Sequence, residues 1–170
     1  MLRASFDIRI SCFDCDSTLT PTLAPRIPMG PYEHEIPIRV RYCETDAMGF
    51  LHHSNFLSYF EMGRTELFRA QGGDYRKMEE GGHFFVVVEM NVKYRAPARF
   101  DDLLSLRTRV VRVTPAKLEH EYKLTRDGVA IADANSVLAC VDRQGHVRRI
   151  SDVIPELTEM RPRHPIERPA

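Results

Sequence analysis

One segment of this 170-residue sequence, residues 55–70, repeats apolar side chains at the three- and four-residue spacing of an α-helix. Leu57, Met62 and Phe68 extend the apolar surface beyond one stripe. Ser54 or Asn55 can provide the N-cap, so the pattern predicts a helix from about Asn55 to Ala70. A helix that is apolar on several sides must be covered by other parts of the fold, which constrains what the remaining chain can build.

The other patterned segments alternate between apolar and polar residues, as half-buried β-strands do. Strands are predicted at Ile36–Tyr42, Phe84–Arg95, Leu103–Val113, about 117–124, and Val129–Val141. In the second strand the residues predicted to face inward are Phe84, Val86, Val88, Met90, Val92 and Tyr94. Asp127-Gly128 indicates a tight hairpin before the last strand.

The order of these segments is strand, helix and then four antiparallel strands, which predicts an α+β fold with one five-stranded sheet packed on one helix. The sheet's edges and its uncovered face favour homo-oligomerisation. We expect the folded domain at residues 36–153, with an irregular, proline-punctuated extension at 1–35 and a proline-rich tail at 154–170. A short strand at Phe6–Phe13 is the alternative within the extension.

Charge and composition favour a small-molecule partner. The chain has 24 Lys+Arg and 24 Asp+Glu, so nothing in its balance favours a nucleic acid. The longest apolar run, Phe84–Val88, is too short for membrane insertion. Four unevenly spread cysteines are typical of reduced thiols, and no targeting signal is recognisable, so a cytoplasmic location is expected.

The densest group of chemically capable residues is the loop between the first strand and the helix, within Arg39–Phe56. Asp46 could act there as a nucleophile or a general base, or it could simply accept N–H groups of a turn. Seven residues later the chain reaches the start of the predicted helix, whose first turn is formed by His52, His53, Ser54 and Asn55. Backbone N–H groups there lack intrahelical acceptors. A carboxylate beside such donors is the pairing that acyl transfer requires.

The run R-V-x4-T-D-x2-G-F-L-H-H-x-N, from Arg39 to Asn55, resembles the active-site motif of the 4-hydroxybenzoyl-CoA thioesterase family of hotdog-fold enzymes, and most closely the acyl-CoA thioesterases of the YbgC type. A Tyr-x-Ala-Pro-Ala-Arg stretch at Tyr94–Arg99 is part of the resemblance. The resemblance implies a five-stranded sheet wrapped around a central helix, and dimers or tetramers with active sites at subunit interfaces.

The same resemblance implies roles for three residues. Asp46 takes the position of the catalytic aspartate, and His53 provides the backbone N–H that polarises the thioester carbonyl. Tyr42 belongs to the site and is expected to orient the Asp46 carboxylate. The implied reaction is hydrolysis of an acyl-CoA thioester to the free acid and CoA, with no metal or organic cofactor. A hydratase or dehydratase acting on acyl thioesters, or a non-catalytic acyl-CoA-binding protein, are the alternatives, because one fold can carry several functions.

Several other residues have both a chemical and a structural interpretation. Glu61 could be a catalytic carboxylate on the helix, although pairing with Arg64 is the simpler interpretation. The Cys12-x-x-Cys15 pair has no second ligand pair, and the adjacent His52 and His53 cannot easily share one metal ion, so no metal site is predicted. His120 is interpreted as a core histidine whose hydrogen bonds are satisfied, and not as a ligand. Five arginines could bind CoA phosphates or lie on a solvated strand face: Arg95, Arg99, Arg107, Arg109 and Arg112.

Overall fold

The computed structural model describes residues 32–154, which form one sheet, one long helix and three short helical segments. The strands are β1 (Glu33–Arg39), β2 (Phe84–Tyr94), β3 (Leu103–Val113), β4 (Lys117–Arg126) and β5 (Val129–Val141). The helical segments are η1 (Tyr42–Glu44), α1 (His53–Ala70), α2 (Tyr75–Glu80) and η2 (Ile150–Asp152). The Cys12/Cys15 pair, the Phe6–Phe13 alternative and nearly all of the predicted extension and tail lie outside the described residues.

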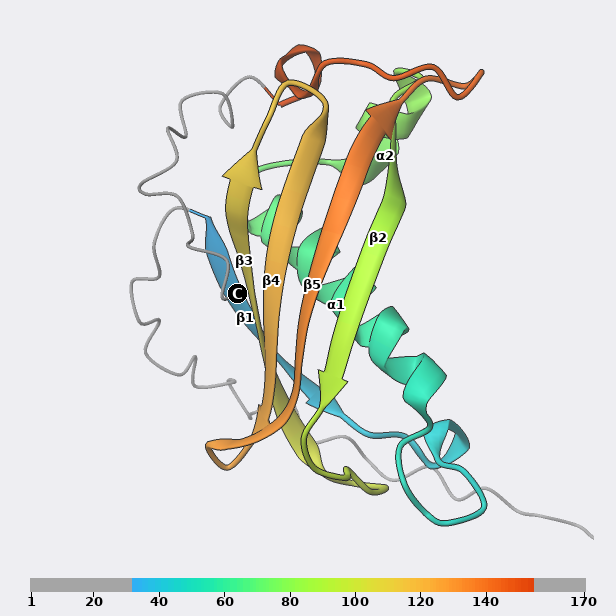
Figure 1. Ribbon diagram of the computed structural model, residues 1–170, viewed down its shortest axis with the longest axis vertical. Coiled ribbons are helices and arrows are strands. Elements are labelled where there is room, and N and C mark those ends of the chain that lie inside the picture. The colour runs from blue at the N-terminus through green and yellow to red at the C-terminus, as the bar shows by residue number, and fades with distance from the viewer. Residues whose placement is uncertain (1–31, 155–170) are drawn as a thin grey trace, which may run out of the picture.

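The five strands form one antiparallel sheet in the order β1-β3-β4-β5-β2, and α1 crosses one face of it (Figure 1). The predicted α+β arrangement is therefore confirmed. The predicted bounds of β3 and β5 are confirmed as well, and Asp127 and Gly128 form the expected turn with positive φ angles of 50° and 81°.

The buried face of α1 packs directly on the centre of the sheet. Phe56, Tyr59 and Phe60 join a core cluster with inward residues of β1, β3, β4 and β5. Helix and sheet approach most closely at Gly63, where an added Cβ atom would lie 2.3 Å from Thr108 Oγ1 of β3. Leu57 and Met62, on the far side of α1, are exposed in the single chain.

One predicted strand boundary and the predicted N-cap of the helix are wrong. The first strand ends at Arg39 and not at Tyr42, because the chain turns into η1, where the Arg41 N–H donates to Glu44 Oε2 at 2.7 Å. The N-cap of the helix is His52 and not Ser54 or Asn55, because the side chain of His52 accepts from the Ser54 N–H, and the helix therefore begins at His53.

The predicted inward face of β2 is wrong in its first half. A register shift between Val87 and Glu89 inserts one residue, and such a bulge interrupts the alternation of side chains. Val86, Val87 and Val88 are all exposed, so alternation is lost over these three residues, while Phe85 packs inward. Met90 and Val92, after the bulge, face the core as predicted.

The short helix α2 was not predicted. Asp74 caps it by accepting from the Lys77 N–H, and Met78 is its buried residue. A six-residue helix contains too few residues to show helical periodicity, which explains why the pattern did not reveal it. No helix among the described residues is long and apolar enough to span a membrane.

Candidate active site

The loop between η1 and α1 folds back on itself around Asp46. The Asp46 N–H donates to Phe50 O at 2.8 Å, and Asp46 Oδ1 accepts from the N–H groups of Met48 and Phe50 at 2.8 and 3.2 Å. Gly49 closes this turn with φ +75°, a conformation that L-residues with side chains rarely adopt. Within the described residues Oδ2 of Asp46 has no hydrogen-bond partner, so one carboxylate oxygen is used by the turn and the other is free.

The segment after β2 holds the Asp46 loop against the sheet. Leu51 N–H donates to Ala98 O at 2.8 Å, and Phe50 forms a bridge with Arg99. The Arg99 guanidinium lies 4.5 Å above the Phe50 ring, in a cation–π contact. Tyr94, at the other end of the Tyr-x-Ala-Pro-Ala-Arg stretch, donates its hydroxyl to His53 O at 3.3 Å. This stretch therefore contacts both the loop and the start of α1.

Glu44 connects η1 to the helix and was not identified from the sequence. Its buried carboxylate accepts from Arg41 Nη2 at 2.6 Å and from the Tyr59 hydroxyl at 2.6 Å. Its backbone O accepts from the His52 N–H at 2.9 Å and from Asn55 Nδ2 at 2.8 Å. One residue thus fixes the positions of η1 and of the first turn of α1 relative to each other.

The environment of Glu44 favours its ionised form. Burial alone would raise the pKa of this carboxyl, but the hydrogen bonds from Arg41 and Tyr59 outweigh burial and hold its pKa below the usual value. The same contact acts in the opposite direction on its partner: burial and the nearby Glu44 carboxylate raise the pKa of Tyr59, which stays protonated and remains a donor.

The first turn of α1 presents backbone donors at the end of the loop. His53 is the first helical residue, and no acceptor for its N–H is found within residues 32–154. Its exposed ring lies against that of His52, with centroids 4.1 Å apart. The positive end of the helix dipole is located at the same place.

Tyr42 does not contact Asp46 within one chain. Its side chain is 77% exposed and packs edge-on against Phe100, with ring centroids 5.5 Å apart. The loop therefore brings Asp46 and the start of α1 into one connected turn structure, whereas the Tyr42 side chain points onto the surface beside it.

Comparison with known proteins identifies the family of this chain. The model of the thioesterase superfamily matches residues 48–131. The acyl-CoA thioesterase YbgC of Haemophilus influenzae is 36% identical over 107 residues, which are 62% of this chain and 79% of that protein. The acyl-CoA thioester hydrolase YbgC of Escherichia coli is 31% identical over 107 residues, 62% of this chain and 80% of its own length. This chain belongs to the thioesterase superfamily.

A solved structure gives the same result for the fold. A thioesterase of Thermus thermophilus, complexed with coenzyme A and Zn, is 28% identical with a TM-score of 0.63, covering 74% of this chain and 90% of that one. The predicted hotdog architecture and the resemblance to YbgC-type thioesterases are both confirmed. The family match starts two residues after Asp46, so it does not include the candidate catalytic residue.

The remaining candidate residues of this thioesterase have structural partners, with one exception. Glu61 pairs with Arg64 at 3.2 Å on α1. Four of the five arginines considered as phosphate ligands pair with carboxylates, namely Arg95 with Asp133, Arg107 with Glu33, Arg109 with Glu121, and Arg112 with Glu119. Arg99 is the one of the five with no carboxylate partner among the described residues. Within the same residues, no three His, Cys, Asp or Glu side chains group as a metal site.

A substitution of Glu44 tests whether this residue fixes the loop. Glu44→Gln is expected to lower the free energy of unfolding by about 1–3 kcal/mol at pH 7, because the Tyr59 hydroxyl and the Arg41 N–H lose a charged acceptor. Urea unfolding at a fixed protein concentration measures the difference. Glu66→Gln, which removes an exposed carboxylate paired with Arg69, is the control and should change stability by less than about 0.5 kcal/mol.

The pH dependence of the free energy of unfolding tests the same role of Glu44. The pKa of Glu44 is lower in the folded than in the unfolded chain, so its contribution is fully present above the usual value of 4.5 and is lost as the pH falls through the lowered pKa. The difference between parent and Glu44→Gln should shrink below about pH 4. Equal stability of the two proteins at pH 7 would contradict the role given to Glu44.

Proposed function

We propose that this protein is an acyl-CoA thioesterase that hydrolyses an acyl-CoA thioester to the free acid and CoA. The observation that carries the proposal is the Asp46 loop, which ends at the first turn of α1 and leaves one carboxylate oxygen of Asp46 without a partner. The YbgC relatives are acyl-CoA thioester hydrolases by name, and the Thermus thioesterase is complexed with coenzyme A. Both findings support a CoA thioester as the substrate.

In this proposal Asp46 is the catalytic residue. The Met48 and Phe50 N–H groups hold Oδ1 and so orient the carboxylate, which leaves Oδ2 to attack the thioester carbonyl or to take a proton from an attacking water. Both routes require the ionised carboxylate and both release the CoA thiol. The proposal therefore makes the charge of Asp46 essential for either route.

The His53 N–H is proposed to donate to the carbonyl oxygen as negative charge develops there. The donor has no acceptor within the described residues, and the helix dipole adds positive potential at the same point. Tyr94 and Glu44 support this role indirectly, because they fix the first turn through His53 O and the His52 N–H. Tyr42, exposed beside the loop, is proposed to complete the site against bound substrate or a second subunit.

Arg99 is the arginine proposed to meet a CoA phosphate. It is exposed next to the Asp46 loop, and its Nη1 lies 3.8 Å from the place of a Cβ on Gly49. Its cation–π contact with Phe50 orients the guanidinium while leaving its N–H groups available. Each of the four paired arginines would have to break its ion pair with a carboxylate before it could bind a CoA phosphate.

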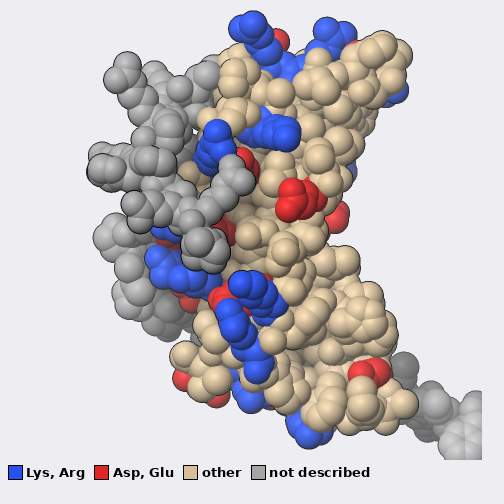
Figure 2. Space-filling model, viewed as in Figure 1, with Lys and Arg blue, Asp and Glu red and all other residues tan. Residues whose placement is uncertain are grey.

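The active form is proposed to be a homodimer or homotetramer. β2 is an edge strand whose Val86, Val87 and Val88 are 42–57% exposed, and an unpaired apolar edge favours pairing with another copy. Figure 2 shows that the part of the sheet face over β2 and β5 carries few charged side chains. The free thiols of Cys43 and Cys140 fit the proposed cytoplasmic location.

Replacement of the proposed catalytic carboxylate tests the function. Asp46→Asn keeps an oxygen that can accept from Met48 and Phe50 but removes the charge, so thiol release from acyl-CoA should fall by roughly 10² to 10⁴. Glu61→Gln is the matched carboxylate control and should cost less than about tenfold, because the exposed Glu61 carboxylate only pairs with Arg64 on α1. His53→Ala should lie between the two, since its backbone N–H survives the substitution.

The comparison is made on variants whose melting temperature and oligomeric state match the parent. Turnover is followed by thiol release over short, long and aromatic acyl-CoAs, with enoyl-CoA hydration measured in parallel. Near-parental turnover of Asp46→Asn with loss of activity in Glu61→Gln would move the site to the helix. Hydration without thiol release would replace hydrolysis as the reaction.

Chelation tests the metal-free mechanism. Thiol release should be unchanged after treatment with EDTA, because the proposed groups are a carboxylate and a backbone N–H, and residues 32–154 contain no cluster of three metal-ligating side chains. The control is the same treatment followed by added Zn²⁺. Loss of turnover on chelation that returns with Zn²⁺ would contradict a mechanism carried by Asp46 alone.

The assembly is tested at the β2 edge. Sedimentation at micromolar concentration should show at least a dimer. Val87→Lys places a charge on the exposed apolar edge and should shift the protein toward monomer, whereas Lys93→Gln, on the same strand, should leave its mass unchanged. A fully active parental monomer would contradict the proposed assembly.

A further inference from the structure

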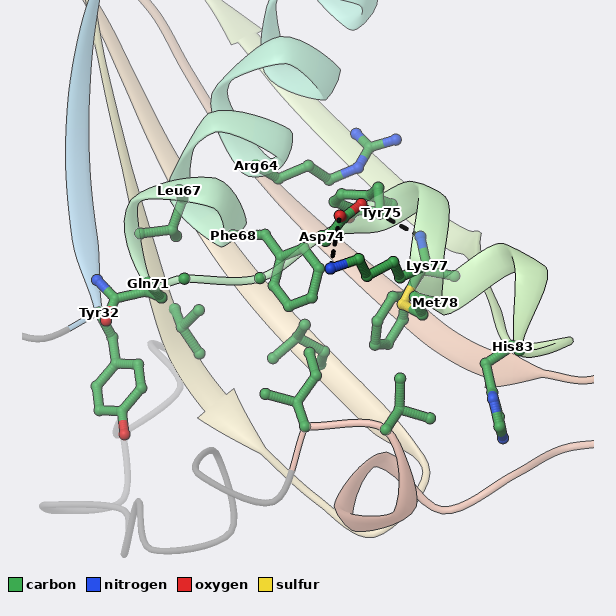
Figure 3. A pocket seen from close by; sticks show the side chains of 18 of the residues that line it. Tyr32, Arg64, Leu67, Phe68, Gln71, Asp74, Tyr75, Lys77, Met78 and His83 are labelled. Atoms are coloured by element: carbon green, nitrogen blue, oxygen red, sulfur yellow. Dashed lines mark hydrogen bonds and ion pairs between the residues drawn. The ribbon is translucent and has the colours of Figure 1, made fainter.

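A cleft of about 610 Å³ lies at the end of α1 opposite the Asp46 loop (Figure 3). It is enclosed by α1, α2, the inner faces of β3 and β4, and η2. Apolar side chains form much of its wall, namely Leu67, Phe68, Met78, Phe85, Val110 and Leu118. Exposed charged side chains line it as well, namely Asp74, Lys77 and Asp152. Its size is that of a pocket for a small organic molecule.

Two polar side chains that line this cleft are themselves buried. Arg64 of α1 is only 9% exposed, and its one ion pair is to the outward-facing Glu61 through Nη2 at 3.2 Å. In Figure 3 the Arg64 side chain runs above the Tyr75 ring, at the edge of the cleft. The Arg64 side chain also hydrogen-bonds the Tyr122 hydroxyl of β4. A guanidinium has five N–H donors, so one exposed carboxylate and one hydroxyl leave it capacity for another anion.

His120 of β4 is the second polar group. It is 4% exposed, lines the cleft, and has no hydrogen bond within the described residues, with its Nδ1 wholly buried. Burial and the nearby Arg64 charge lower the pKa of His120 to about 3, so the imidazole is neutral and retains one N–H donor. A buried polar group without a partner costs stability and is rarely kept without a reason.

We propose that this cleft is a second ligand site, which binds a monocarboxylate with an apolar body, its carboxylate held by Arg64 and His120. Charge complementarity favours this class at the Arg64 end of the cleft. The two carboxylates that also line the cleft, Asp74 and Asp152, are exposed, and Asp74 pairs with Lys77, whereas Arg64 and His120 are buried. A cation placed beside Arg64 would be repelled, and a carboxylate there would give the guanidinium a second anionic partner. The apolar body would lie against Phe68 and Met78. Arg64 is about 16 Å along the helix axis from His53, which separates this site from the Asp46 loop of the same chain.

Binding of octanoate by the full chain tests the proposal. Isothermal titration should show one saturable site per chain for octanoate, and at least tenfold weaker binding of 1-octanol, which has the same chain length without the charge. Arg64→Met and His120→Leu should each weaken octanoate binding at least tenfold. Glu61→Gln should tighten it severalfold, because it removes the competing carboxylate while leaving the core intact.

Two control variants locate the site. Lys77→Gln removes an exposed cation at the rim of the same cleft, and Asp46→Asn alters the loop, so both should bind octanoate within twofold of the parent. If Arg64→Met does not fold, Glu61→Gln and His120→Leu decide the question. Four outcomes would each overturn the proposal. The first two are that octanoate does not bind saturably, or that it binds no better than 1-octanol. The others are that binding is unchanged in both Glu61→Gln and His120→Leu, or that it is lost in Asp46→Asn.

Discussion

The packing of α1 on the inner face of the sheet is the constraint on which the rest of this structure depends. Gly63 lets the helix backbone approach β3 so closely that the Cβ of any other residue would collide with Thr108 and Leu106. Phe56, Tyr59 and Phe60 bury the N-terminal half of α1, and Leu67 joins a separate core cluster at its other end. Because the helix is held along its length on one face of the sheet (Figure 1), its two ends are fixed relative to the sheet, and one of the two proposed sites lies at each end.

At the N-terminal end, Glu44 links the core to the loop. Tyr59, held in the core, donates to the Glu44 carboxylate, and the Glu44 backbone in turn accepts from His52 and Asn55. The start of α1 is thus positioned by a buried ionised group that the fold has to keep deprotonated. The proposed oxyanion donor is the N–H of His53, the residue after His52. The contacts that fix His52 therefore also fix the position of this N–H.

Much of the fold could be predicted from the sequence because periodicity reports which face of a segment is buried. Leu103–Val113 and Val129–Val141 alternate regularly, and their bounds are those of β3 and β5. The failures are places where a single contact overrides periodicity. The bulge between Val87 and Glu89 interrupts the alternation, and His52 caps α1 in place of the expected Ser54 or Asn55.

The candidate site was only partly predictable for a related reason. Asp46 and His53 stand in a recognisable motif, but the role of Glu44 depends on Tyr59, fifteen residues later, and no local pattern indicates that contact. The cleft beside Arg64 could not be predicted from the sequence either. Residues of α2 and η2 form part of its wall, and these segments are too short to show periodicity. His120 was predicted to be a core histidine with satisfied hydrogen bonds. Its burial confirms the first part, but the second part is wrong, because its buried Nδ1 has no hydrogen-bond partner among the described residues.

The sequence left two interpretations of Asp46 open, a turn-stabilising residue and a catalytic carboxylate, and the geometry shows that they do not compete. Oδ1 accepts both turn N–H groups, so the turn needs one oxygen only. The turn fixes the direction in which Oδ2 points, and a catalytic group is effective when its orientation is fixed before the substrate binds. An aspartate that only stabilised a turn could be replaced by asparagine without loss, whereas a catalytic one could not, because only the ionised carboxylate can attack a carbonyl or accept a proton. The charge of Asp46, and not its hydrogen bonds, therefore separates the two interpretations.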